Sequence, residues 1–156
     1  MSDDPQATRE EVQRVAYRLL SRRDHARTEL VRKLRDRKLP RELIEQVVDD
    51  LQQAGYVDDR QFALDQGAIL ARKQWGPNRI RQKLRDRGIA DALVDQTLQQ
   101  LAGQFDFPEM AFERLESKFG PPDQLDDRAR QKAFRHLRHR GYAPGLIRRL
   151  LFDGGL

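Results

Sequence analysis

The chain has 156 residues, of which 38% are hydrophobic and 35% are charged, and its formal net charge is +5. This composition cannot fill one thick hydrophobic core, and it favours surface-rich elements such as amphipathic helices. The absence of cysteine excludes disulfides, iron–sulfur clusters and thiol catalysis, and no apolar run approaches the length of a transmembrane helix.

The N-terminal residues 1–11, MSDDPQATREE, are acidic and polar, unlike the rest of this basic chain. They do not resemble a signal peptide, so we expect a cytoplasmic protein. We expect this segment either to be disordered or to screen the basic residues that follow it.

Residues 12–57 form the first of three expected units, each built from three helices. Apolar residues follow helical spacing from Val12 to Leu20. Thr8 and Glu11 match a capping box, which predicts that the first helix begins there. The second and third helices of the unit show the same apolar periodicity.

The turn between the second and third helices is marked by glycine in two of the units. Gly88 and Gly141 stand where the second helix should end, in the position of a left-handed cap. Lys38 occupies this position in the first unit, so we expect its turn to differ. Pro40 suits the first turn of the helix that follows, where a missing N–H costs nothing.

Two breaks in the helical pattern separate the units. Gly55 can end a helix, and Asp58 is an N-cap candidate with Gln61 three residues on. The second break is the looser stretch GQFDFP at 103–108. The expected units are therefore 12–57, 58–103 and 104–156.

The three units are copies of one another. Residues 33–51, KLRDRKLPRELIEQVVDDL, recur fifty residues later as KLRDRGIADALVDQTLQQL. Residues 137–151, LRHRGYAPGLIRRLL, align with 84–98 at a shift of 53. Repetition at this period is typical of stacked helical modules.

We therefore predict an all-α protein of three tandem three-helix repeats that form an elongated, curved helical array. A unit of this size buries only a marginal core by itself, so neighbouring units should support one another. Trp75 and Tyr56 fall near loops or helix ends, and we expect both to pack between units. Such an array presents long surfaces instead of a deep pocket.

The sequence offers few residues for catalysis or metal binding. His136 and His139 could share one helix face, but no third ligand stands at a recognisable spacing. The acidic pairs at 58–59 and 126–127 precede helices, where carboxylates satisfy free N–H groups and the helix dipole. There is no glycine-rich phosphate loop. We predict no enzymatic activity, no cofactor and no metal.

Arginine carries the strongest functional signal, because its planar fork suits phosphate and carboxylate. Arg32 and Arg35 lie off the apolar stripe of their helix and should point outward. Stacked copies would align such residues into a basic stripe suited to a strand of phosphates, with binding that weakens as salt rises. Basic residues that end the first helices of units one and two have an alternative, stabilising role at the negative helix end. The candidate partner- or DNA-binding residues are Arg22, Arg23, Arg32, Arg35, Arg72, Lys73, Arg81, Arg85, Arg135 and Arg138.

An ordered set of motifs resembles the RecX family, bacterial modulators of the RecA recombinase, over residues 12 to 152. The motifs are RRDHARTELVRKL (22–34), GYVDDRQFA (55–63), QWGPNRIRQKLRDRGI (74–89), SKFG (117–120) and RGY (140–142). This sequence departs from the family pattern at Ala26, where Ser or Thr often caps the second helix, which leaves Asp24 or His25 to help. Trp75 replaces a tyrosine often found before Gly-Pro.

The resemblance implies tandem three-helix repeats that bind RecA and lie in the helical groove of RecA filaments on DNA. It implies restraint of ATP hydrolysis, coprotease activity and strand exchange, and hence a role in DNA repair and the SOS response. RecX proteins have no active site, so no catalytic residue carries over. We expect a monomer without membrane contact that spans several filament protomers. The alternative is a direct binder of single- or double-stranded DNA whose contact with the recombinase is secondary.

Overall fold

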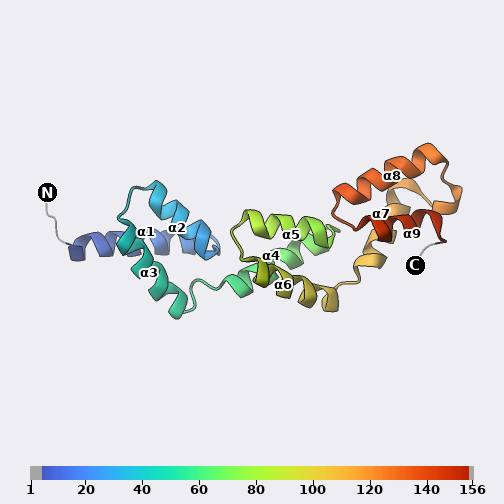
Figure 1. Ribbon diagram of the computed structural model, residues 1–156. Coiled ribbons are helices and arrows are strands. Elements are labelled where there is room, and N and C mark those ends of the chain that lie inside the picture. Colours follow the sequence, from blue (N-terminus) through green and yellow to red (C-terminus); the bar gives the residue numbers. More distant parts are fainter. Residues whose placement is uncertain (1–4, 155–156) are drawn as a thin grey trace.

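The computed structural model describes residues 5–154, and within that range it contains nine α-helices, one 3₁₀ helix and no β-strand (Figure 1). The α-helices are α1 (Pro5–Arg22), α2 (Arg27–Asp36), α3 (Arg41–Gln53), α4 (Asp59–Arg72), α5 (Pro77–Asp86), α6 (Asp91–Gln104), α7 (Phe107–Phe119), α8 (Asp127–His139) and α9 (Pro144–Phe152). The 3₁₀ helix η1 (Pro122–Gln124) lies between α7 and α8. The predicted all-α fold is confirmed.

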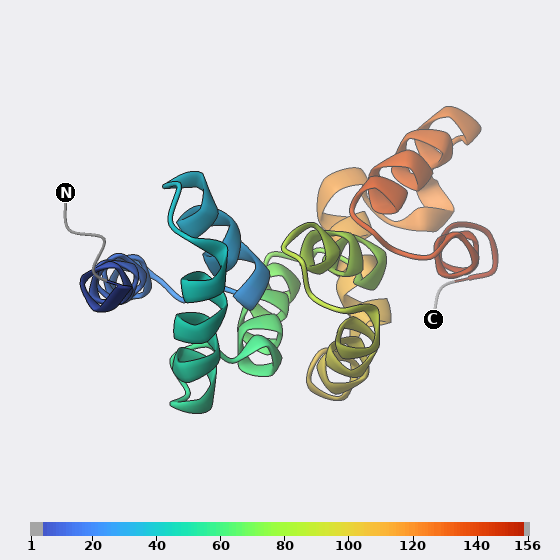
Figure 2. The same ribbon diagram turned by 60° about the vertical axis from the view of Figure 1, so that its left-hand side comes forward.

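The helices form three successive groups along an elongated body. Figure 1 shows α1–α3, α4–α6 and α7–α9 following one another, with the two chain termini at opposite ends. The turned view in Figure 2 keeps this order and shows the third group off the line of the first two. In Figure 1, the second helix of each group, namely α2, α5 and α8, lies along the same upper side of the body. The tandem arrangement of three-helix repeats is confirmed, whereas the exact unit boundaries stay a prediction.

The first helix begins earlier than predicted. Thr8 and Glu11 were expected to start it, but α1 begins at Pro5, whose fixed φ suits the first helical position. Arg9, just after this added turn, donates to Gln46 Oε1 at 2.6 Å and to Asp50 Oδ2 at 2.5 Å, both on α3. Residues 5–11 are therefore helical, and the acidic residues at 1–4 lie outside the described residues.

The turn that ends the second helix is left-handed in all three units. Gly88 and Gly141 have φ of 80° and 99°, so the predicted caps are confirmed. Lys38 has φ of 61°, and the expectation of a different turn in the first unit is therefore wrong. A non-glycine residue can adopt this conformation at a cost of about 1–2 kcal/mol, and Lys38 does so.

At the break between units one and two, the observed helix ends agree with the residues that the sequence predicted. Asp58 is the N-cap of α4 and accepts the backbone N–H of Gln61 at 3.2 Å, as predicted. Gly55, with φ of 87°, follows the end of α3. Pro40 directly precedes α3 instead of lying in its first turn.

Buried residues of the described chain form two hydrophobic cores, not three. Helices α1–α3 enclose one, whose largest members include Leu30, Leu34 and Ile44. Helices α4–α9 share the other, which is continuous across units two and three. Ala26 of the first unit belongs to this second core. Units two and three are thus joined by apolar packing more extensively than units one and two.

Candidate functional site

The predicted basic stripe divides into free and paired arginines. Arg32 and Arg35 on α2 and Arg135 and Arg138 on α8 are exposed. In the described part of the chain, none of these four side chains forms an ion pair or a hydrogen bond. Because α2 belongs to the first group of helices and α8 to the third (Figure 1), both ends of the body carry exposed arginines that pair with no acid of the described residues.

In the middle unit, acidic residues of α6 pair with the arginines of the stripe. Arg81 Nη1 lies 2.5 Å from Asp95 Oδ1, and Arg85 Nε donates to Asp91 Oδ1 at 2.7 Å. The Arg85 hydrogen bond and charge lower the pKa of Asp91. Position 91 holds an acid in this unit alone, since Arg41 and Pro144 stand at the matching positions. The expected stripe is therefore interrupted at α5.

The remaining candidates lie at the ends of the first helices. Arg22 ends α1, Arg72 ends α4, and both are exposed, as is Lys73. Arg23 differs, because its guanidinium turns back toward the carboxylate of Glu29 at 3.4 Å. Arg23 therefore acts within the fold.

Successive units contact each other at two places, which we call the first and second joints. At the first joint the start of α2 packs against the turn after α5, and at the second joint the start of α5 packs against the turn after α8. The first joint brings residues 26–29 against 87–89, and the second brings 76–79 against 140–142. The motif Arg-Gly recurs at 87–88 and 140–141. The sequence showed this repetition, but its role as the contact between units was missed.

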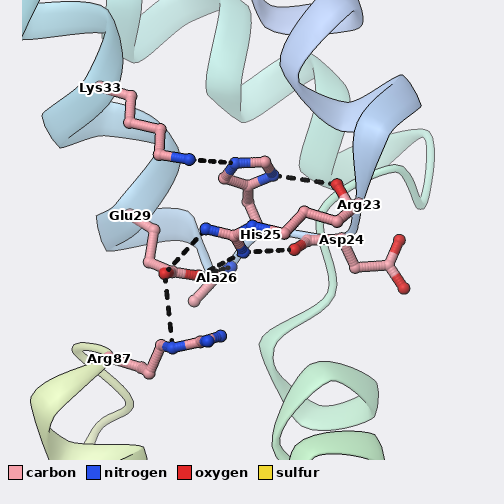
Figure 3. Close-up of polar contacts among 7 residues, drawn as sticks. All are labelled: Arg23, Asp24, His25, Ala26, Glu29, Lys33 and Arg87. Atoms are coloured by element: carbon pink, nitrogen blue, oxygen red, sulfur yellow. Dashed lines mark hydrogen bonds and ion pairs between the residues drawn. The ribbon is translucent and has the colours of Figure 1, made fainter.

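Glu29 is the centre of the first joint (Figure 3). Its side chain is buried, and one carboxylate serves Arg23 of its own unit and Arg87 of the next, whose Nε lies 3.6 Å away. The backbone N–H of Ala26 also donates to it at 3.1 Å. Burial alone would raise the pKa of Glu29, but these hydrogen bonds and the charge of Arg87 outweigh burial and lower it.

His25 also belongs to this network, through hydrogen bonds to the Arg23 carbonyl and to Lys33. Its Nδ1 donates to the carbonyl of Arg23 at 3.0 Å, so Nε2 accepts from the Lys33 ammonium at 2.9 Å (Figure 3). Burial lowers the pKa of His25, and the charges of Arg23 and Lys33 add to this effect. A neutral imidazole therefore links the α1–α2 turn to α2.

The first joint also caps α2 from outside its own unit. The backbone N–H of Arg27 donates to Asp59 Oδ1, on α4, at 2.8 Å. The expectation that Asp24 or His25 would compensate for Ala26 is wrong, because the following unit and Glu29 take the free N–H groups. Thr28 Oγ1 donates to the Gly88 carbonyl at 3.4 Å.

The second joint uses main-chain hydrogen bonds and an aromatic ring. Gly76 N–H donates to the Arg140 carbonyl at 2.7 Å, and Asn78 N–H to the Gly141 carbonyl at 2.9 Å. The Arg140 guanidinium lies over Trp75, 3.7 Å from the ring centre, and donates to the carbonyl of Lys73. Trp75 therefore packs between units as predicted.

Two tyrosines behave differently from each other. Tyr142, at the second joint, donates its hydroxyl to the Gln74 carbonyl at 2.8 Å, and burial raises its pKa to about 12. Tyr56 is 57% exposed, and its ring contacts Tyr17 at the edge, 5.6 Å between centroids. Tyr17 belongs to the first unit, so the prediction that Tyr56 packs between units is wrong.

A depression of about 130 Å³ beside the first joint is lined by Asp24, His25, Gly55, Tyr56, Asp58, Gln61 and Phe62. Residues 5–154 hold no group of three His, Cys, Asp or Glu side chains placed to bind a metal ion. None of the described helices combines the length and apolarity needed to cross a membrane.

Known proteins resemble this chain over nearly all of its length. The family model for the first three-helix domain of RecX matches residues 14–51, and that for the second matches 58–98. "Regulatory protein RecX" of Pseudomonas savastanoi pv. phaseolicola is 38% identical over 92% of this chain and 92% of its own. "Regulatory protein RecX" of Ectopseudomonas mendocina is 38% identical over 97% of each chain.

Solved structures share the fold. The crystal structure of RecX from Lactobacillus salivarius superposes with a TM-score of 0.83 at 18% identity, covering 95% of this chain and 97% of that one. A crystal structure of a regulatory protein RecX gives a TM-score of 0.78 at 23% identity, covering 94% and 72%.

Proposed function

Because the chain belongs to the RecX family of regulatory proteins, we propose that it binds the RecA recombinase and RecA filaments on DNA. In this proposal it restrains ATP hydrolysis, coprotease activity and strand exchange, and so takes part in the control of DNA repair and the SOS response. It works in the cytoplasm as a monomer, without a cofactor and without catalysis of its own.

The observation that carries this proposal is two pairs of exposed arginines without an ion-pair partner in the described residues, one pair toward each end of an elongated body. Arg32 and Arg35 lie in the first unit, and Arg135 and Arg138 lie in the third. A rod with charge at both ends can contact more than one protomer of a helical filament at once. Weak contacts that act together favour the polymer over the free monomer through effective concentration.

The mechanism is steric and electrostatic. Lying in the filament groove, the rod would block subunit rearrangement, growth at the filament end or access of a second DNA. The two joints matter here, because they hold the units in one relative orientation and so fix the spacing between the charged ends. Many exposed pairs of roughly 0.3–0.5 kcal/mol each suffice for such binding when several form together.

The test measures ATP hydrolysis by RecA on single-stranded DNA as the protein is added. A variant with Arg32, Arg35, Arg135 and Arg138 changed to Glu should need about tenfold more protein for half inhibition, since four contacts of this size sum to about 1.2–2 kcal/mol and about 1.4 kcal/mol corresponds to a factor of ten. The matched control changes four other exposed arginines to Glu, none of which lies on α2, α5 or α8. They are Arg14, Arg18, Arg60 and Arg149. The control has the same net charge and should inhibit nearly as well as the unchanged protein. Unaltered ATP hydrolysis at excess unchanged protein would refute the proposal.

The second candidate function is direct DNA binding, and the same exposed arginines favour it. Equal affinity for bare DNA and for RecA-coated DNA would support this function over the first. Binding to bare DNA should then weaken steeply with salt, because each neutralised phosphate releases counterions. The decisive comparison measures binding to RecA filament, free RecA and bare DNA across one salt series.

A further inference from the structure

His136 of α8 lies between two cations of α7. Arg114 Nε donates to His136 Nε2 at 3.1 Å, and Lys118 Nζ lies 3.4 Å from His136 Nδ1. The edge of the imidazole meets the ring of Phe119, 5.7 Å between centroids. The histidine is therefore held in place with a positive group at each nitrogen.

This arrangement has more donors than acceptors. A neutral imidazole has one lone pair and one N–H. If Nε2 accepts from Arg114, the proton is on Nδ1 and faces the ammonium of Lys118. If Nδ1 accepts from Lys118 instead, the N–H faces Arg114. In either tautomer one cation meets a donor, so the cluster lacks an acceptor.

The cluster also lacks negative charge. Of the ion pairs within the described residues, none includes Arg114, Lys118 or Arg140. Burial, together with the charges of Lys118 and Arg114 on α7, Arg140 after α8 and His139 at its end, lowers the pKa of His136 to about 4. The cations of the first joint, by contrast, share the carboxylate of Glu29.

Arg140, at the second joint, adds to the excess of positive charge near His136. Its Nε is buried and has no hydrogen-bond partner, while the rest of its guanidinium lies over Trp75 and donates to the Lys73 carbonyl. Burial lowers the pKa of Arg140, with the charge of Arg114 acting in the same direction. Arg140 is thus committed to the joint, and its charge acts on the neighbouring cluster without being neutralised.

We propose that Arg114, Lys118 and His136 form a binding site for a phosphate group. A free phosphate ion offers at least three acceptor oxygens, one for each of three separate donors, whereas a carboxylate has two oxygens. A phosphate within a nucleic acid strand has two unesterified oxygens, each of which can accept from more than one donor. Guanidinium is well suited to phosphate, and lysine binds it as a point charge. The phosphate is either a free ion or part of a nucleic acid strand. The site is independent of the proposed action on RecA.

Phosphate binding at this site is coupled to proton uptake. A bound anion makes the protonated imidazole favourable, so the pKa of His136 is higher in the bound than in the free protein. Because binding then takes up a proton at His136, linkage requires the affinity for a phosphate species of fixed charge to increase as pH falls toward the free pKa of about 4.

The experiment follows the ring resonances of His136 by NMR in the full chain, with His139 as the internal comparison. Inorganic phosphate is titrated against chloride at equal ionic strength, and a short single-stranded oligonucleotide forms the second arm. We expect phosphate to move the His136 resonances and to raise its titration midpoint. If the oligonucleotide moves them and inorganic phosphate competes with it, the source is a strand; if phosphate alone does so, the source is the free ion.

Variants separate the site from general charge. Changing Arg114 and Lys118 to Gln should weaken phosphate binding by about tenfold or more, since the anion then loses two charged hydrogen-bond donors. The matched change to Gln of Arg14 and Lys83, which are exposed on α1 and α5 far from α7 and α8 in the sequence, should leave binding unchanged. The proposal is overturned if chloride shifts the His136 resonances as much as phosphate does, or if neither phosphate nor oligonucleotide shifts them in the unchanged protein.

Discussion

Gly141 of the third unit lies so close to Arg79 of the second that a β-carbon on Gly141 would overlap the Arg79 backbone nitrogen. The first joint repeats this relationship, since a β-carbon on Gly88 would stand 2.7 Å from the Thr28 Cβ. Both glycines also have positive φ. Each joint therefore depends on an absent side chain for close approach as well as on backbone conformation.

Replacing Gly141 with Ala should open the second joint. The left-handed backbone costs about 1–2 kcal/mol, and overpacking adds roughly 1–3 kcal/mol. Urea unfolding followed by the fluorescence of Trp75, the one tryptophan of the chain, should report a lower midpoint. Gly55→Ala is the control, because Gly55 ends its helix with the same left-handed turn but has no atom within 4 Å of a β-carbon. Equal losses in the two variants would show that the joint tolerates a β-carbon.

Replacing Lys38 with Gly should stabilise the protein by about 0.5–1 kcal/mol. The substitution removes left-handed strain of about 1–2 kcal/mol and adds less than that in unfolded-state entropy. Lys38 is exposed, whereas Thr28 and Arg79 pack against the corresponding turns of the later units. The free energy of unfolding is the measurement. The reverse change, Gly88→Lys, should instead be strongly destabilising, and a loss of stability in Lys38→Gly would contradict this account.

Replacing Glu29 with Gln should make the free energy of unfolding less dependent on pH in the acidic range. The folded pKa of Glu29 lies below its ordinary value of 4.5, so its contribution is complete above pH 4.5 and is lost as pH falls through the folded pKa. We expect Glu29→Gln to lower the free energy of unfolding by about 1–3 kcal/mol at neutral pH. The difference from the unchanged protein should shrink as pH falls below 4.5.

The control for this titration is Glu10→Gln, because Glu10 is exposed on α1 and makes no ion pair within the described residues. Urea unfolding over a pH series measures all three proteins. If the difference in free energy of unfolding between Glu29→Gln and the unchanged protein stays constant down to pH 3, the ionised carboxylate does not cause the stabilisation.

Patterns within short stretches of sequence were sufficient for the helices and many of their ends. The apolar spacing of α3, the N-cap at Asp58 and the left-handed turns at Gly88 and Gly141 all arise from contacts within a few residues. The repeat of these patterns predicted a tandem array, because equal local patterns fold into equal units. The earlier start of α1 was missed because residues 5–11 show no apolar periodicity, although Pro5 suits the first helical position.

The sequence by itself determined three similar helical units and an exposed, arginine-rich surface, since helix formation and side-chain direction follow from local spacing. Only the tertiary structure decided which arginines are free. Arg35 and Arg85 occupy matching positions, yet Arg85 is paired with Asp91, whereas Arg35 is not paired within the described chain. The tertiary structure also merged two of the expected cores into one. Both outcomes depend on distances between helices that are far apart in sequence, and no local pattern encodes those distances.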